Sequence, residues 1–387
     1  MVIVLAGLGG PLLSVLGRRF VPVVVGELLA GIVVGPAVLG ALHPADATVA
    51  FLGEIGFAML MLTVGMQLPL RDRRLAASAR EGALLAALVC LLAIPAGLAA
   101  AAIAGGAHGA VYAVVLASGS AAVLLPAFEE LGLGGVAAMT VMAQVAIADI
   151  ITILSVPIVL QPARVGHAAL GALLVTALAA ALFLTARLLG TVEWIHHVRR
   201  LSKRRHWALD LRISLLVLFL LAWVAQKGGT SILVAGFGAG VMVAVIGGPK
   251  RLSTQVRGVA EGFFIPLYFV VLGARLDLAG LIENPTMLAL TAALAGLNLA
   301  IHLLASLLMR RGVAGALAAT AQLGVPAAVA SLGLTEHLLS PVVATAIVAS
   351  ALVSLALCTI GVQMLARAAD TGAPQPGQPR AMAQTAP

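Results

Sequence analysis

The chain has 387 residues, of which 61 % are hydrophobic and only 10 % charged, against about 45–50 % and about 25 % in ordinary soluble domains. This composition excludes a soluble protein of two or three domains and predicts one multi-span membrane domain. The formal charge of +8 comes from short Lys and Arg clusters between apolar runs, with few aromatic residues beside them, so we interpret it as membrane topology and expect no nucleic-acid partner.

Apolar runs of membrane-spanning length recur along the whole chain. A span needs about 20 predominantly apolar residues, and Gly, Pro and charged clusters separate the runs. The predicted fold class is an all-α multi-span membrane protein with thirteen transmembrane helices. Their predicted ranges are 2–17, 20–41, 49–67, 82–104, 109–130, 136–160, 166–190, 208–225, 229–247, 258–274, 284–309, 313–335 and 340–366. The membrane domain is therefore 1–366, followed by a disordered cytoplasmic tail, 367–387, rich in Pro, Gln and Ala.

The distribution of basic residues supports this count. With the N-terminus outside, thirteen alternating spans leave only Arg164, Lys227 and Arg275 of the 23 Lys and Arg residues on the outer side. This asymmetry follows the positive-inside rule, and an error of one helix would destroy it. We therefore expect a multi-pass protein of a bacterial-type plasma membrane with a cytoplasmic C-terminus.

The two halves of the chain resemble each other. The stretch around Gly65 matches the stretch around Gly273, and the stretch around Gly31 matches that around Gly240. Equivalent spans are seven apart, an odd number, so the halves are predicted to have opposite orientation in the membrane. The domain then consists of repeat one (2–160), a linking span (166–190) and repeat two (208–366). Inverted repeats of six helices are typical of secondary transporters, whose sites lie on interrupted helices near the midplane.

Two segments are candidates for such interrupted helices. LASGSAAVLLP (116–126) and AQLGVPAAVAS (321–331) each combine Gly and small polar residues with a Pro that removes a backbone hydrogen bond. We expect the freed carbonyls and helix ends to lie beside a bound ion. The ordinary alternative is a kinked helix with small residues for close packing. The candidate residues of these segments are Ser118, Gly119, Ser120, Gln322 and Gly324.

The sixth predicted span contains an isolated acid, Asp149, in QVAIADIITIL (144–154). It lies near mid-membrane, where a charged Asp costs about 2.5–3.5 kcal/mol on insertion scales. Such residues usually face a cavity or a transport pathway, although a protonated Asp bonded between helices is an alternative. A single carboxylate can hold a proton or a cation, but not both. Thr152, three positions later, is a further candidate.

The longest polar stretch, 191–212, contains the basic sequence HHVRRLSKRRH and connects the seventh and eighth spans. It is either an amphipathic helix on anionic headgroups or a solvated linker.

His302 is the other titratable side chain in the middle of a span, with Asn298 one turn earlier. An imidazole changes charge near neutral pH in water, so His302 could compensate the charge of Asp149 when no cation is bound. A satisfied core histidine is the alternative. The sequence contains no arrangement typical of a zinc site, a Ser/His/Asp triad or a P-loop. We therefore expect no enzyme activity and no cofactor.

With these segments in order, the sequence resembles the monovalent cation:proton antiporter superfamily, in its Kef-type second branch. The matching stretches are PVVVGELLAGIVVGP, LGEIGFAMLMLTVGMQLPL, ASGSAAVLLPAFEELGLGG, the Asp149 span, FFIPLYFVVLGARLDL, and AQLGVPAAVASLGL with the stretch that follows it. The resemblance implies crossed, broken fifth and twelfth spans beside the aspartate of the sixth. It also implies a homodimer in which a core domain moves like an elevator against a dimerisation domain.

The sequence departs from the family pattern at three places. Ala148 stands where relatives usually have Asn, Asp or Gln, and His302 stands where the eleventh span usually has Lys or Arg. In the twelfth span Gln322 is kept, but the acid of the Kef-type pattern is lost. The site is thereby reduced to one carboxylate with a titratable partner.

We therefore expect a secondary active transporter that exchanges Na⁺ or K⁺ for H⁺ by alternating access, with proton and cation competing at Asp149. A channel-like or regulated K⁺ efflux pathway is one alternative. A transporter of organic anions on the same inverted-repeat fold is another.

Overall fold

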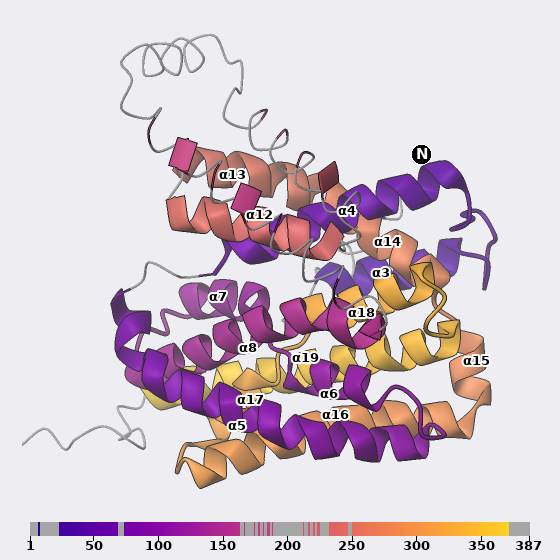
Figure 1. Cartoon of the computed structure of the whole chain (residues 1–387). Helices are drawn as coiled ribbons and strands as arrows, with labels where there is room; N and C mark the ends of the chain where they lie inside the picture. Colours follow the sequence, from indigo (N-terminus) through magenta and orange to yellow (C-terminus); the bar gives the residue numbers. More distant parts are fainter. Residues whose placement is uncertain are drawn as a thin grey trace, which may run out of the picture.

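The computed structural model describes residues 23–68, 73–162, 232–246 and 250–370, together with a few isolated positions elsewhere. These ranges are helical, apart from the connections between helices (Figure 1). The helices are α3 (Val23–Val34), α4 (Ala47–Met66), α5 (Arg73–Ile103), α6 (Gly109–Ala117), α7 (Ala121–Glu130), α8 (Val136–Leu160), α12 (Ile232–Ile246), α13 (Lys250–Val259), the π-helix η2 (Ala260–Phe264), α14 (Ile265–Arg275), α15 (Leu278–Glu283), α16 (Pro285–Leu308), α17 (Val313–Ala319), α18 (Gly324–Thr335) and α19 (Pro341–Asp370).

Helices of membrane-spanning length and composition dominate the described part of the chain. Eight stretches there are long and apolar enough to cross a membrane, and the shorter apolar helices α3 and α12 accompany them. The protein is therefore a multi-pass membrane protein. The predicted spans 2–17, 166–190 and 208–225 and the polar stretch 191–212 lie almost entirely outside the described residues, so the count of thirteen stays a prediction.

Several predicted helix ends agree with the structure and others do not. Helix α8 begins and ends at the predicted residues. Helix α5 begins at Arg73 instead of residue 82, because helix-forming Arg, Ala and Glu residues extend it beyond the apolar run. Helix α19 continues to Asp370. The predicted tail boundary at residue 367 is therefore wrong, since Ala-rich sequence prolongs the helix past its last apolar turn; residues 371–387 lie outside the described part.

Side-chain caps fix the start of two long helices. Asp46 accepts hydrogen bonds from the backbone N–H groups of Thr48 (2.8 Å) and Val49 (3.2 Å) at the start of α4. Asn284 does the same for Thr286 and Met287 at the start of α16, where Pro285 is the first helical residue. These side chains replace the helical partners that the first N–H groups of a helix lack. Both caps lie at the same end of the molecule.

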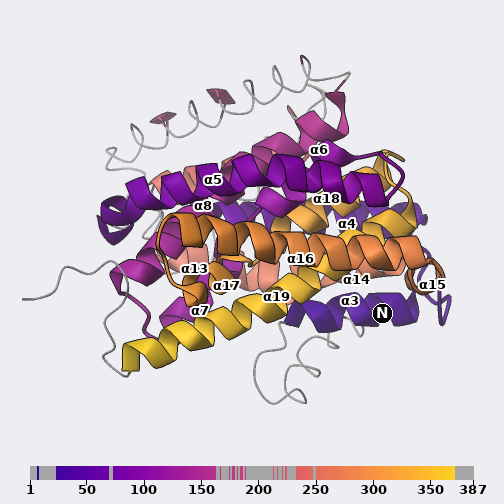
Figure 2. The same cartoon turned by 90° about the horizontal axis from the view of Figure 1, so that it is seen from below.

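The described helices form two groups. The first group contains α3, α4, α12, α13, η2 and α14, and the second contains α5 to α8 and α15 to α19. Figure 1 shows α4, α12 and α13 above the second group, and Figure 2 gives the view from below. Helices pack closely within each group and touch more sparsely across the boundary. A buried hydrogen bond crosses it, from the Tyr268 hydroxyl on α14 to the Ala327 carbonyl on α18 (2.9 Å).

Glycines allow two helix pairs of the first group to approach closely. A Cβ atom on Gly31 of α3 would collide with the Val270 carbonyl of α14, and one on Gly273 would collide with the Leu28 carbonyl of α3. Between α4 and α12, Gly65 and Gly240 face each other in the same way. Close backbone contact through small residues is the usual means of packing helices in lipid. Each contact therefore joins one helix from each half of the sequence.

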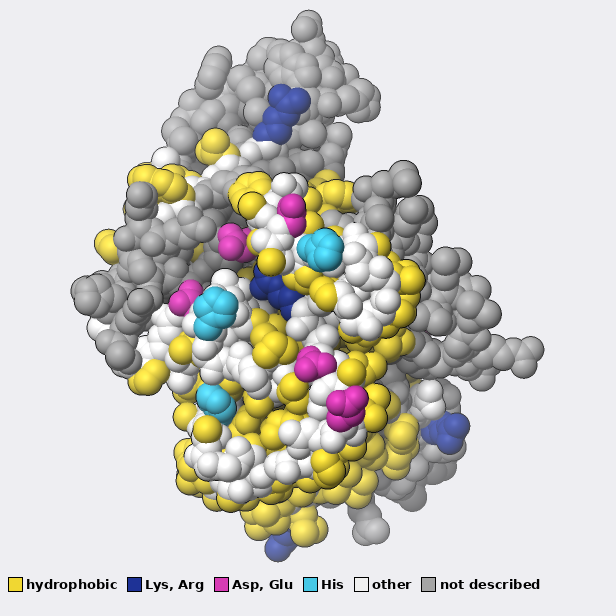
Figure 3. Space-filling model, turned by 90° about the vertical axis from the view of Figure 1, so that its right-hand side faces the viewer, with side chains coloured by type: hydrophobic (Ala, Val, Ile, Leu, Met, Phe, Trp, Pro, Cys, Tyr) yellow, Lys and Arg dark blue, Asp and Glu magenta, His cyan; other side chains and the backbone are white. Residues whose placement is uncertain are grey.

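The two ends of the molecule differ in charge. Four connections meet at one end, 35–46, 104–108, 276–284 and 336–340, and none contains Lys or Arg. In Figure 3 acidic and histidine side chains surround a basic one on this end. The acidic residues of these connections include Asp46, Glu283 and Glu336. At the opposite end Arg311 of the α16–α17 connection pairs with Glu81 of α5. The connections at the two ends thus differ in their content of Lys and Arg.

Candidate functional site

Helix α8 places the carboxylate of Asp149 deep inside the second group. The side chain is 1 % exposed. Its Oδ2 atom accepts a hydrogen bond of 3.4 Å from the backbone N–H of Ala121. Its Oδ1 atom is buried and has no hydrogen-bond partner among the described residues. A buried oxygen without a donor is costly in a low-dielectric interior. Of the two carboxylate oxygens of Asp149, only Oδ2 is therefore satisfied by a described group.

The fifth predicted span is interrupted beside this carboxylate. Helix α6 ends at Ala117, α7 begins at Ala121, and residues 118–120 between them, the first break, are extended. The first N–H groups of a helix lack helical partners, and the helix dipole gives its N-terminus a partial positive charge. Ala121 is the first residue of α7. The break therefore directs a favourable N–H group and the positive end of α7 toward Asp149.

Gly119 allows the first break to lie against α8. A Cβ atom at this position would stand 2.7 Å from the Cγ1 atom and 3.0 Å from the carbonyl oxygen of Val145. Real Cβ atoms essentially never approach other atoms this closely. Val145 lies one turn before Asp149 on α8. A residue without a side chain is thus required for the break to reach the aspartate.

The twelfth predicted span is interrupted as well. Helix α17 ends at Ala319 and α18 begins at Gly324, leaving residues 320–323, the second break, without helical structure. Figure 1 shows α6 and α18 toward one end of the molecule and α7 and α17 toward the other. The two broken spans therefore run in opposite directions.

The two breaks meet through the side chain of Gln322. Its Nε2 atom donates a hydrogen bond of 2.7 Å to the carbonyl oxygen of Val115, in the last turn of α6. The Ser118 hydroxyl donates to the same oxygen, also at 2.7 Å. One carbonyl near the first break thus binds a side chain from each broken span. The structure therefore brings Ser118, Gly119, Ser120, Gln322 and Asp149 into one continuous region.

Prolines do not cause these interruptions, and the predicted reason for the breaks is wrong. Pro126 lies in the middle of α7, six residues after the first break. Pro326 lies in the first turn of α18, where its missing N–H would have had no helical partner. The first break instead coincides with the Ser-Gly-Ser sequence, whose residues favour non-helical backbone and local hydrogen bonds.

Thr152 and His302 bond to backbone carbonyls of their own helices. The Thr152 hydroxyl donates to the backbone carbonyl of Ala148 at 2.7 Å, within its own helix. His302 forms a hydrogen bond of 2.9 Å between its Nδ1 atom and the Asn298 carbonyl. The Thr152 hydroxyl also lies 3.3 Å from the backbone carbonyl oxygen of Asp149, but within the described ranges no hydrogen bond or ion pair joins either side chain to the Asp149 carboxylate. Their predicted roles stay predictions.

Three parts of the site were not among the residues predicted from the sequence. The Val115 carbonyl and the Ala121 N–H are backbone atoms, which no side-chain pattern reveals. A polar cluster of Asn298, Thr320 and Ser354 lies behind the second break, where Asn298 donates to the other two residues. Ser350 and Ser354, four positions apart on an apolar helix, were the available signal for this cluster.

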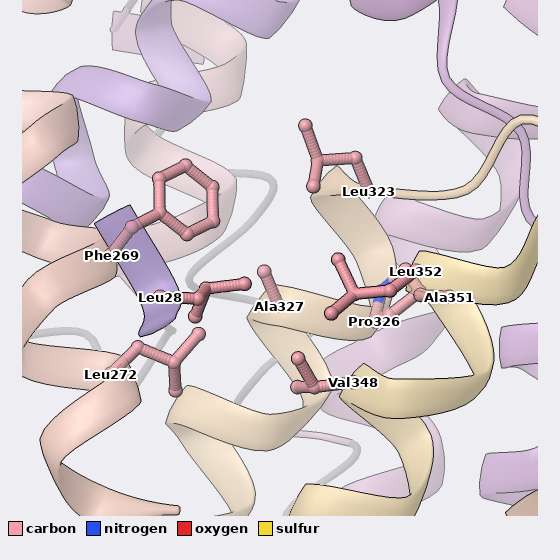
Figure 4. A pocket seen from close by; sticks show the side chains of 9 residues that line it. All are labelled: Leu28, Phe269, Leu272, Leu323, Pro326, Ala327, Val348, Ala351 and Leu352. Atoms are coloured by element: carbon pink, nitrogen blue, oxygen red, sulfur yellow. The ribbon is translucent and has the colours of Figure 1, made fainter. Parts of the chain in front are cut away.

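An apolar cavity borders the second break at the boundary between the two groups (Figure 4). Its lining is Leu28, Phe269 and Leu272 from the first group and Leu323, Pro326, Ala327, Val348, Ala351 and Leu352 from the second. It offers an ion no polar side chain. Within the described residues, no three His, Cys, Asp or Glu side chains form a cluster that could hold a metal. The Asp149 region is therefore the best candidate for ion binding.

Comparison with protein-family models gives a match over most of the chain. Residues 1–368 match the model described as "Sodium/hydrogen exchanger, transmembrane". Among curated proteins, the chain is 26 % identical over 286 residues to the probable Na⁺/H⁺ antiporter 3 of Methanocaldococcus jannaschii, covering 68 % of each chain. It is also 37 % identical over 76 residues to the putative Na⁺/H⁺ antiporter YjbQ of Bacillus subtilis, a match covering 20 % of this chain and 12 % of that protein.

Solved structures show a similar fold. The structure of the sodium proton antiporter MjNhaP1 from Methanocaldococcus jannaschii at pH 8 aligns with a TM-score of 0.62 and 17 % sequence identity. The alignment covers 95 % of this chain and 96 % of that one. An electron-microscopy structure of the same antiporter gives a TM-score of 0.58, also at 17 % identity, with 97 % of each chain covered. At this identity the likeness concerns the fold alone.

Proposed function

The chain belongs to the sodium/hydrogen exchanger family, and we propose that it exchanges Na⁺ for H⁺ across a membrane by alternating access, with Asp149 as the carrier of both ions. It is a transporter and not an enzyme. The observation that carries the assignment to Asp149 is the buried Oδ1 atom without a partner, beside the first turn of α7. A proton or a desolvated cation would each occupy that position.

Competition at one carboxylate couples the two fluxes. The Ala121 N–H occupies Oδ2, so Oδ1 is the oxygen open to a ligand. When a proton binds there, the negative charge that attracts the cation is lost. A ligand shifts a conformational equilibrium only through its different affinities for the two states. Exchange therefore requires that the loaded carboxylate, with either ion, crosses the membrane more readily than the empty charged one.

Sodium is the cation favoured by the similar proteins, because both curated relatives are named as Na⁺/H⁺ antiporters. K⁺, which the Kef-type resemblance suggests, is the alternative ion. Hard monovalent cations bind oxygen atoms, and the hydroxyls of Ser118 and Ser120 and the carbonyls of the first break belong to the segment that bonds to Asp149 through the Ala121 N–H. We assign Asp149 as the principal ligand of the transported cation and these oxygens as auxiliary ligands.

Two inverted repeats are proposed as the architecture that permits alternating access. If Gly31 corresponds to Gly240 and Gly65 to Gly273, the repeat operation converts the Gly31–Gly273 contact into the Gly240–Gly65 contact. Both contacts occur in the structure, between α3 and α14 and between α4 and α12. This reciprocity supports the proposed symmetry. The second group would then move against the first, whose outer surface would pair with a second copy of the chain.

The proposed orientation places the basic end in the cytoplasm of a bacterial-type cell. This end carries the α16–α17 connection with Arg310 and Arg311, and α19 finishes there. The end with acidic and histidine residues would face outward. Both statements rest on the positive-inside rule, because that rule relates topology to Lys and Arg in short connections.

The proposal is tested in proteoliposomes that contain a pH-sensitive dye. A gradient of Na⁺, K⁺ or Li⁺ is imposed, and proton movement is followed for the native protein, Asp149→Asn and the control Glu54→Gln, whose side chain is exposed on α4. We expect Asp149→Asn to abolish exchange and Glu54→Gln to retain it. Full exchange by Asp149→Asn would overturn the assignment. Cation flux without opposite proton movement would indicate a channel-like pathway instead.

A further inference from the structure

Asn298 holds a buried polar cluster behind the second break. The side chain lies in the middle of α16 and is 0 % exposed. Its Nδ2 atom donates one hydrogen bond to the carbonyl of Thr320 (3.2 Å) and another to the hydroxyl of Ser354 on α19 (2.9 Å). Its Oδ1 atom has no partner. The amide hydrogens therefore anchor this side chain between two other helical segments.

The bond to Thr320 satisfies a carbonyl that the break sets free. Thr320 follows the last residue of α17, so its carbonyl has left the helical hydrogen-bond ladder. An unpaired carbonyl in a membrane interior costs several kcal/mol in general, and the C-terminus of a helix carries a partial negative charge. A neutral amide satisfies this carbonyl without adding a charge to the site. Asn298 thus stabilises the second break with hydrogen bonds alone.

Asn298 connects to Asp149 through a short sequence of contacts. Thr320, which Asn298 holds, lies two residues before Gln322. Gln322 donates to the Val115 carbonyl, which also binds the Ser118 hydroxyl. The first break ends at Ala121, whose N–H donates to Asp149. Displacement of the Thr320 carbonyl would therefore be transmitted through both breaks to the carboxylate.

We propose that Asn298 is a positioning residue of the ion site, which fixes the second break through its bonds to Thr320 and Ser354 and so sets the place of Gln322. This inference rests on the proposed function, since it concerns the same site. Asn298 touches neither ion. It affects the affinity for the cation by holding the two breaks at fixed positions relative to Asp149.

The first test compares Asn298→Leu, which keeps similar volume and removes both donors, with the native protein in the proteoliposome assay. We expect the KM for Na⁺ to rise about tenfold, which corresponds to a loss of about 1.4 kcal/mol in binding free energy. The maximal rate should change less than threefold. Asn298→Ser, which keeps one donor, should lie between the two. Ser306→Ala removes a buried hydroxyl from the same helix outside the cluster and should leave KM unchanged.

A double-mutant cycle separates positioning from a general loss of stability. If Asn298 acts through Gln322, the combination of Asn298→Leu with Gln322→Leu should raise KM no further than Gln322→Leu alone, since coupled residues are not additive. Multiplicative effects of the two changes, or an unchanged KM in Asn298→Leu, would overturn the inference. If Asn298→Leu is not recovered as folded protein, Asn298→Ser takes its place in the same cycle.

A negative result for Asn298 can be distinguished from a failure of the proposed function. A native protein that exchanges Na⁺ for H⁺, together with an unaltered Asn298→Leu variant, would overturn the role of Asn298 and leave the role of Asp149 intact. Exchange that survives Asp149→Asn would overturn the proposed function itself.

Discussion

The side-chain amide of Gln322 donates a hydrogen bond of 2.7 Å to the backbone carbonyl of Val115, 207 positions away in sequence. Each partner belongs to one of the two interrupted helices. The bond therefore fixes the breaks relative to each other at the point where Ser118 also binds the Val115 carbonyl.

Replacement of Gln322 by Leu should separate the two breaks. The variant leaves the Val115 carbonyl with the Ser118 hydroxyl alone, and a lost buried hydrogen bond costs about 1–3 kcal/mol when its partner stays unsatisfied. We expect the KM for Na⁺ to rise about fivefold to a hundredfold in proteoliposomes. Gln67→Leu, a buried glutamine at the end of α4 in the other helix group, is the control and should exchange normally. An unaffected Gln322→Leu variant would show that the breaks hold their places without this bond.

A methyl group at Gly119 should push the first break away from α8. Gly119→Ala would place a Cβ atom 2.7 Å from the side chain of Val145, and overpacking of this kind costs about 1–3 kcal/mol. We expect slower exchange and a lower melting temperature in detergent. In the control, Gly296→Ala, the added Cβ meets no atom within 4 Å and replaces a weak helix former in α16. Equal behaviour of the two variants would contradict the close contact.

Removal of the Tyr268 hydroxyl should weaken the boundary between the helix groups. Tyr268→Phe loses the bond to the Ala327 carbonyl, with a net effect of about 0.5–1.5 kcal/mol. We expect amide hydrogen exchange in α18 to become about twofold to tenfold faster. Tyr112→Phe is the matched control, because the Tyr112 hydroxyl is buried without a partner and its removal should cost nothing. Unchanged exchange rates in Tyr268→Phe would show that this bond does not hold the groups together.

Transport should not generate a membrane potential. In the described part of the chain, Asp149 and Glu27 are the buried acids, and Glu27 lies on α3 in the first group. One carboxylate that carries either one proton or one monovalent cation exchanges them one for one. We expect the Na⁺/H⁺ exchange rate to be independent of an imposed K⁺/valinomycin potential, and Glu27→Gln to retain this behaviour. A potential-dependent rate in the native protein that disappears in Glu27→Gln would assign a second charge to Glu27.

Sequence patterns predicted the breaks better than their cause. Glycine and small polar residues in otherwise apolar spans indicated where the two breaks lie, at residues 118–120 and around Gln322. The prolines suggested a wrong mechanism, because Pro126 is accommodated inside α7 and Pro326 lies where a helix tolerates proline. Local sequence shows where a helix is weak, but tertiary contacts decide at which residue it ends.

The partners of each polar group could not be predicted from sequence. Asn298 was visible as a polar residue one turn from His302, yet its bonds reach Thr320 and Ser354 on other helices. Backbone atoms such as the Val115 carbonyl carry no residue-specific signal at all. Hydropathy and charge, in contrast, predicted α8 to the residue, since length and apolarity alone determine such a helix.

The glycine contact between α3 and α14 also has a consequence for biosynthesis. Gly273 is translated about 240 residues after Gly31, so α3 enters the membrane long before its closest neighbour exists. During that interval, the groove on α3 at Gly31 must be filled by lipid or by another helix. Neither half of the chain can complete its own packing, and we expect the halves, expressed as separate fragments, to be degraded singly and to assemble when produced together.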